Sequence, residues 1–129
     1  MNDTMDRTGS AAPSRGLAAT GAILAALGVA LGAFGTHALG PVLNDARMAT
    51  FETAVRYQTH QAIGLLVLAV LPRPTRAAAS LLLAGTLIFS GSLYLLVATD
   101  ASWLGAVAPI GGAGMIAGWA LVAWKLLRV

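Results

Sequence analysis

The sequence predicts an all-α fold, an integral membrane bundle of four transmembrane helices with the N- and C-termini in the cytoplasm. Three observations support this class. The 129 residues are 57% hydrophobic and only 10% charged, whereas a soluble domain carries about 25% charged residues. The apolar residues form runs long enough to cross a bilayer, which takes about 20 residues. Short polar stretches with glycine or proline separate these runs.

The chain divides into a tail and a membrane domain. Residues 1–15 are polar and mixed, so we expect a disordered cytoplasmic tail ahead of a four-helix domain at 16–129. Gly40-Pro41 ends the first predicted helix, Asn44 caps the second, and the prolines of the 72–76 turn end it. The predicted helices span about 16–39, 46–71, 77–98 and 104–126.

The basic residues decide the expected orientation. With four spans, both termini and the 72–76 turn share one side, and the positive-inside rule places that side in the cytoplasm. Trp119 and Trp124 near the end of the last helix are expected to form an aromatic belt there. The basic residues on this side are Arg7, Arg15, Arg73, Arg76, Lys125 and Arg128, which leaves Arg47 and Arg56 for the other side.

Small residues recur along one face of the first predicted helix at alternating steps of four and three. This seam consists of Gly21, Ala25, Gly28, Gly32 and Gly35. Glycine lowers helix propensity, so its repetition on one face predicts the close approach of a neighbouring helix. Gly114 and Gly118 in the fourth span lead to the same prediction.

The first half of the second predicted helix, residues 51–62, is rich in polar side chains. Glu52, Arg56 and His60 are four residues apart and share one helix face. Ionisable groups at membrane depth normally face a bundle interior or a water-filled cavity. We therefore expect this face to point inward, against the glycine seam. The candidate polar site comprises His37, Glu52, Arg56, Tyr57, Gln58, His60 and Gln61.

Depth along the helices separates the two histidines. At 1.5 Å per residue, His60 lies about 18 Å from the turn at Pro72 and His37 about 33 Å from Arg15. The difference of roughly 15 Å argues against one haem or metal ion ligated by both histidines. Glu52 is level with His37 and is expected to contact it. An intrahelical Glu52–Arg56 pair and interhelical hydrogen bonding by His60 remain alternatives to a functional site.

Several function classes find no support in the sequence. The chain has no cysteine, which excludes a disulfide, a thiolate metal site and a thiol nucleophile. The basic residues come singly or in pairs, so we expect no nucleic-acid partner. We find no hydrolase constellation and no phosphate-binding loop. We therefore predict no catalytic residue, no metal, no cofactor and no enzymatic activity.

Two motifs carry a resemblance to a known family. Residues 31–39, which include Gly-Ala-Phe-Gly-Thr-His, and residues 51–62, which include Tyr-Gln-Thr-His, resemble the small bacterial membrane proteins called domain of unknown function 423, which are relatives of transmembrane protein 256. Thr36 and Gln61 replace alanines that the family commonly has. The resemblance covers about residue 16 to the C-terminus and implies a multi-pass protein of the bacterial inner membrane without an established activity. Its family-pattern positions are Gly32, Phe34, Gly35, His37, Phe51, Ala54, Tyr57, Gln58 and His60.

Three functions remain open at this point. The first is an accessory or structural subunit that packs with other membrane helices in the lipid bilayer, as a homo-oligomer or within a larger membrane-protein complex. The second is an oligomeric transporter or permeation element that uses the polar face of the second helix. The third is a binder of quinone, lipid or haem.

Overall fold

The computed structural model describes residues 14–71 and 76–128, and these residues are almost entirely helical. No strand occurs within the two ranges, so the predicted all-α class is confirmed. Residues 1–13 of the predicted tail and 72–75 of the predicted turn lie outside the described residues. The elements are α1 (Arg15–Phe34), its π-helical continuation η1 (Gly35–Leu39), α2 (Asp45–Val70), α3 (Arg76–Thr99) and α4 (Leu104–Leu127).

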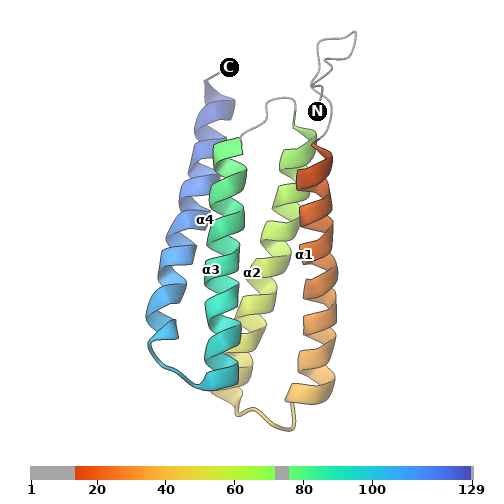
Figure 1. The fold of residues 1–129 in the computed structure, drawn as a ribbon, viewed down its shortest axis with the longest axis vertical. Helices are drawn as coiled ribbons and strands as arrows, with labels where there is room; N and C mark the ends of the chain where they lie inside the picture. Colours follow the sequence, from red (N-terminus) through yellow and green to blue (C-terminus); the bar gives the residue numbers. More distant parts are fainter. Residues whose placement is uncertain (1–13, 72–75, 129) are drawn as a thin grey trace.

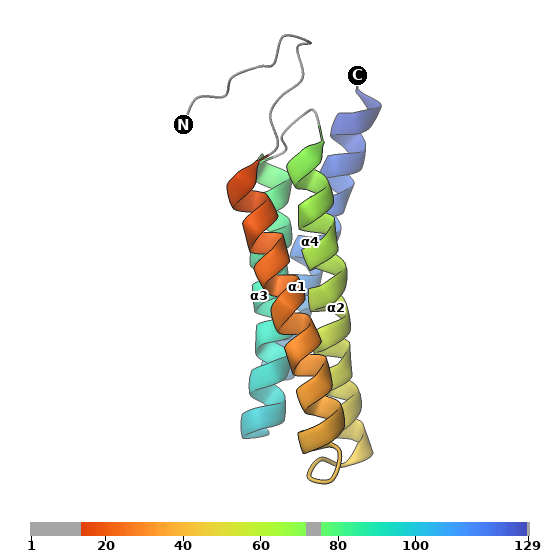
Figure 2. The same ribbon diagram turned by 90° about the vertical axis from the view of Figure 1, so that its right-hand side faces the viewer.

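The helices run side by side, each antiparallel to the next along the chain (Figures 1 and 2). α1 packs on α2, α2 on α3, and α3 on α4. α1 and α4 lie at the two edges of the arrangement in Figure 1. Edge helices keep much apolar surface uncovered, and Val29 on α1 and Ile116 on α4 are each 73% exposed. Lipid is the solvent in which such surfaces are stable.

α3 and α4 approach each other most closely where glycines face each other. A methyl group added to Gly111 would lie 2.6 Å from the carbonyl oxygen of Gly85, so a larger residue would push the two backbones apart. Gly118 lies against Leu82, and Gly114 lies against Gly85. The adjoining core contains apolar residues of three helices: Leu65, Leu68, Ala78, Leu82, Met115 and Val122.

Three of the helices are long and apolar enough to cross a membrane. Among the described residues these are Arg15–Leu39, which combines α1 and η1, and the helices α3 and α4. α2 has 26 residues but does not qualify, because its first half carries the polar side chains. The structure therefore contains three candidate spans and a fourth helix of similar length.

The glycine seam of α1 and η1 lies against α2. Gly21, Gly28 and Gly35 are buried, and methyl groups added to them would lie 2.8 Å from the Ala62 carbonyl oxygen, 2.7 Å from the Thr59 hydroxyl and 2.5 Å from the Phe51 ring, respectively. Gly32 faces Val55, and Ala25 is half-buried.

The face of α2 that meets this seam corrects one expectation. The seam contacts apolar and threonine side chains, whereas Glu52, Arg56 and His60 are exposed on another face of α2. None of the three is buried, so the expected inward orientation is wrong for His60, whereas Glu52 and Arg56 border the seam at an open groove near Gly32 and Gly35. The physical reason is that apolar side chains pack against glycine without loss of hydration, whereas a buried charge needs a partner.

Candidate functional site

The polar residues of α2 divide between two faces. Gln58 and Gln61 are 4% and 8% exposed and lie among the helices. Glu52, Arg56 and His60 are exposed, and the same stripe continues through the exposed residues Ile63 and Val67. We call this stripe the outer face of α2; it consists of Glu52, Arg56, His60, Ile63 and Val67.

Gln58 connects three helices through two hydrogen bonds. The Tyr94 hydroxyl on α3 donates to Gln58 Oε1 at 2.6 Å. Gln58 Nε2 donates to the Leu24 carbonyl oxygen on α1 at 2.9 Å. The Phe51 ring packs against the Tyr94 ring, with centroids 5.5 Å apart. A buried amide needs such partners, and here they fix the register of α1, α2 and α3.

Gln61 connects α2 to α4 in a similar way. Trp119 Nε1 donates to Gln61 Oε1 at 2.7 Å. The indole ring fits against Gly64, where an added methyl group would lie 2.7 Å from Trp119 Cη2. Trp119 is therefore a helix-packing residue, which corrects its expected place in an aromatic belt. Trp124 is exposed, and the Arg128 guanidinium carbon lies 4.4 Å from its ring centroid.

A third polar contact joins α2 and α3. The buried Ser90 hydroxyl donates to the Ala54 carbonyl oxygen at 2.8 Å. Sequence reasoning missed Ser90, Tyr94 and Trp119 as partners of α2. The available signal was an inward stripe with steps of three and four on α2, with Gln58 at its middle. That stripe is Phe51, Ala54, Gln58, Gln61, Leu65 and Leu68.

Tyr57 lies at the edge of the outer face. It is 39% exposed, and its ring contacts those of Phe89 and His60 edge-on, with centroids 5.1 and 5.9 Å apart. The aromatic contact with Phe89 holds Tyr57 against α3. His60 thus stands beside an aromatic ring, on a surface that the helices of this chain leave uncovered.

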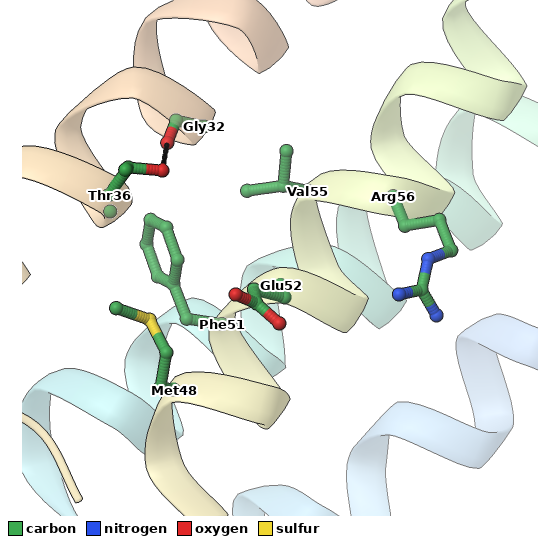
Figure 3. A pocket seen from close by; sticks show the side chains of 8 residues that line it. Gly32, Thr36, Met48, Phe51, Glu52, Val55 and Arg56 are labelled. Atoms are coloured by element: carbon green, nitrogen blue, oxygen red, sulfur yellow. Dashed lines mark hydrogen bonds between the residues drawn. The ribbon is translucent and has the colours of Figure 1, made fainter. Parts of the chain in front are cut away.

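A groove lies between the end of the first helix and α2 (Figure 3). Its cavity volume is about 170 Å³. Figure 3 shows the Glu52 carboxylate directed toward the groove and the Arg56 guanidinium pointing away from that carboxylate. The intrahelical Glu52–Arg56 ion pair, one of the alternatives to a functional site, is therefore not formed in this arrangement. The lining residues are Gly32, Gly35, Thr36, Met48, Phe51, Glu52, Val55 and Arg56.

At the end of the first helix, Thr36 and not His37 lies near Glu52 in the groove. Thr36 lines the groove with Glu52, whereas the neighbouring His37 is exposed and does not line it. The Thr36 hydroxyl donates to the Gly32 carbonyl oxygen at 3.2 Å. This bond gives the Gly32 carbonyl oxygen a side-chain donor close to the point where the chain changes from α- to π-helix.

Arg47 is a polar contact that sequence reasoning did not single out. Asn44 Oδ1 accepts from the Arg47 backbone N–H at 2.8 Å and caps α2. The Arg47 side chain reaches α3, where Nη2 donates to the Val97 carbonyl oxygen. A cation at the carbonyl end of a helix is favourable because it opposes the helix dipole. Arg47 thereby ties the start of α2 to the end of α3.

Within residues 14–71 and 76–128, no group of three His, Cys, Asp or Glu side chains is placed to hold a metal ion. The described polar groups instead form interhelical hydrogen bonds, the groove and the outer face of α2.

Comparisons with known proteins agree with the membrane character of the chain. Residues 31–112 match the family described as "Protein of unknown function (DUF423)". The "UPF0382 membrane protein YwdK" of Bacillus subtilis is 41% identical over 108 residues, which cover 79% of this chain and 88% of the relative. The "UPF0382 inner membrane protein YgdD" of Escherichia coli K12 is 36% identical over 113 residues, or 84% and 86% of the two chains. No solved structure matches the chain.

Proposed function

Because the chain belongs to the DUF423 family, whose bacterial relatives are named membrane proteins, we propose that it is an accessory subunit that packs another membrane-spanning helix against the outer face of α2. The observation that carries the proposal is the exposure of Glu52, Arg56 and His60 on a helix flanked by apolar helices. In this proposal the chain supplies a docking surface and catalyses no reaction.

The outer face reaches the middle of α2. His60 is fifteen residues after Asp45, so it lies about 23 Å along a helix about 39 Å long. Ionisable groups are rare and costly at this depth where lipid surrounds them, and the short side chain of His60 cannot extend to the surface as that of an arginine can. A partner helix that offers a carboxylate, hydroxyl or carbonyl group removes this cost. Ile63 and Val67 on the same face extend the surface with apolar contact area.

We also place α2 across the bilayer, which gives four spans. α2 runs between α1 and α3 and antiparallel to both (Figure 1), so it occupies the same layer as its two apolar neighbours. The start of α1, the start of α3 and the end of α4 then share one end of the molecule. Arg15, Arg76, Lys125 and Arg128 lie at these helix ends, which favours the cytoplasm for that side.

The lack of cysteine makes this topology easy to test. We expect Val42→Cys and Ser102→Cys to react with a membrane-impermeant maleimide added to intact cells. Leu127→Cys should react only after the membrane is permeabilised. Labelling of Val42→Cys and Leu127→Cys from the same side would contradict four spans.

The docking surface is tested by photo-crosslinking in native membranes. A benzophenone amino acid at Ile63, on the outer face, should give a discrete adduct with another membrane protein or with a second copy of this chain. The same group at Ile116, which is exposed on α4, is the matched control and should give none. Arg56→Leu together with His60→Leu should reduce the Ile63 adduct at least several-fold. Equal yields at Ile63 and Ile116 would contradict the proposal.

A further inference from the structure

The groove between the end of the first helix and α2 is lined mainly by apolar groups. Phe51, Val55 and Met48 line it with apolar groups, and Gly35 contributes no side chain. The Thr36 hydroxyl is already bonded to the Gly32 carbonyl oxygen. The hollow therefore favours an apolar occupant. At about 170 Å³, it is close to the cavity of about 150 Å³ that accommodates benzene. A short length of one hydrocarbon chain fits this volume.

The rim of the groove carries one group of each charge. The Glu52 carboxylate is directed toward the hollow, and the Arg56 guanidinium extends from the rim, one helical turn further along α2 (Figure 3). Both side chains are exposed. Because they do not pair with each other, the two charges are available to a ligand that carries both signs. A carboxylate accepts hydrogen bonds, and a guanidinium donates two in parallel to a phosphate.

We propose that this groove binds a zwitterionic phospholipid with a primary ammonium group. The ammonium donates to Glu52, the phosphate accepts from Arg56, and the upper part of an acyl chain lies over Phe51 and Gly35. This ligand complements the apolar floor and both rim charges at once. An anionic lipid without an amine leaves Glu52 unmatched, and a quaternary ammonium has no N–H to donate.

The depth of the groove agrees with a lipid ligand. Glu52 is seven residues after Asp45, about 10 Å from the start of α2, and Arg56 is about 16 Å from it. A bilayer core of about 30 Å within a total of 40–45 Å puts Glu52 close to the head-group boundary. The long side chain of Arg56 reaches the same level by extending toward the surface.

The test uses the full chain purified as a monomer in detergent, so it does not depend on the docking partner of the outer face. Thermal unfolding is followed with added dioleoyl phosphatidylethanolamine, phosphatidylcholine or phosphatidylglycerol, which share their acyl chains. We expect phosphatidylethanolamine to raise Tm by about 5 °C at saturation and the other two to raise it clearly less. Native mass spectrometry should show one retained phosphatidylethanolamine per chain.

Two variants separate the head group from the acyl chain. Glu52→Gln should abolish the difference between phosphatidylethanolamine and phosphatidylcholine, whereas Asp45→Asn, an exposed acid outside the groove, should preserve it. Thr36→Phe should fill the groove and remove the Tm shift, whereas Ala33→Phe, at an exposed position outside the groove, should not. If Thr36→Phe does not fold, Met48→Trp fills the groove from α2.

Three results would overturn the proposal. Equal Tm shifts from all three lipids would mean general solvation by lipid. A larger shift with phosphatidylglycerol would mean an anion site at Arg56 alone. An unchanged preference in Glu52→Gln would remove the assigned role of the carboxylate. Loss of the crosslink at Ile63 with an intact lipid preference would contradict the docking function and leave the lipid site standing.

Discussion

The polar residues of α2 are buried on its inner face, which is the inward stripe from Phe51 to Leu68, and exposed on its outer face. Gln58 and Gln61 are buried and bonded to other helices of the same chain. Arg56 and His60, one or two positions away from them in sequence, are exposed. Amides are neutral, so one or two hydrogen bonds compensate their burial, whereas an ionised group loses much more hydration. The inner face holds this chain together through these bonds, and the outer face is the surface for which we propose a partner outside the chain.

The largest effect is expected from overfilling the inner face. Gly64→Leu forces a side chain into the Trp119 ring and breaks the Gln61 contact, so it should lower the free energy of unfolding by about 3 kcal/mol. Gly91→Leu is the matched control, since open space surrounds that glycine. We expect the control to be neutral or slightly stabilising through helix propensity. Reversible unfolding in mixed micelles, followed by circular dichroism, measures both. Equal losses would contradict the tight fit at Gly64.

The next effect concerns the three-helix hydrogen-bond network. Gln58→Leu keeps the volume but leaves the Tyr94 hydroxyl without its acceptor, at an expected cost of about 2 kcal/mol. Adding Tyr94→Phe removes the unpaired hydroxyl and should recover part of this loss. A double-mutant cycle on the same unfolding equilibrium gives the coupling energy of the pair. Additive losses would show that the two side chains do not interact.

A smaller effect is expected at the contact between α2 and α3. Ser90→Ala removes a hydroxyl that donates to the Ala54 carbonyl oxygen, a backbone group within α2. Interhelical hydrogen bonds in membrane proteins contribute about 0.6 kcal/mol on average, and we expect a loss of that order in the unfolding equilibrium. Thr99→Ala, whose hydroxyl makes only local bonds to the Leu95 carbonyl oxygen and the Ala101 N–H, is the control and should change stability less.

The smallest effect on the stability of the isolated chain is expected on the outer face. His60→Leu should change the free energy of unfolding by no more than about 0.5 kcal/mol, because the side chain is exposed. Gln61→Leu, the adjacent buried position, should cost about 1 kcal/mol by leaving the Trp119 N–H unpaired. If His60→Leu proves as costly as Gln61→Leu, the division of α2 into two faces is wrong.

The pattern of apolar residues in the sequence predicts the inner face of α2 better than the pattern of charged residues does. The ionisable side chains of Glu52, Arg56 and His60 predicted that their stripe points inward, because such groups normally avoid lipid. The stripe of apolar residues around Gln58 runs in steps of three and four from Phe51 to Leu68, and it is the buried one. Arg47 gave no such signal, because its acceptor is the carbonyl of Val97 at the end of another helix.

By itself the sequence determined the all-α class and the membrane location. Both depend on the length and apolarity of local runs, which satisfy their backbone groups within each helix. Only the tertiary structure decided which polar residues of α2 turn inward. Successive residues of a helix differ by about 100° in direction, so the choice depends on where the neighbouring helices lie. The partners of Gln58 and Gln61 are Leu24, Tyr94 and Trp119, which are 34, 36 and 58 positions away in the sequence.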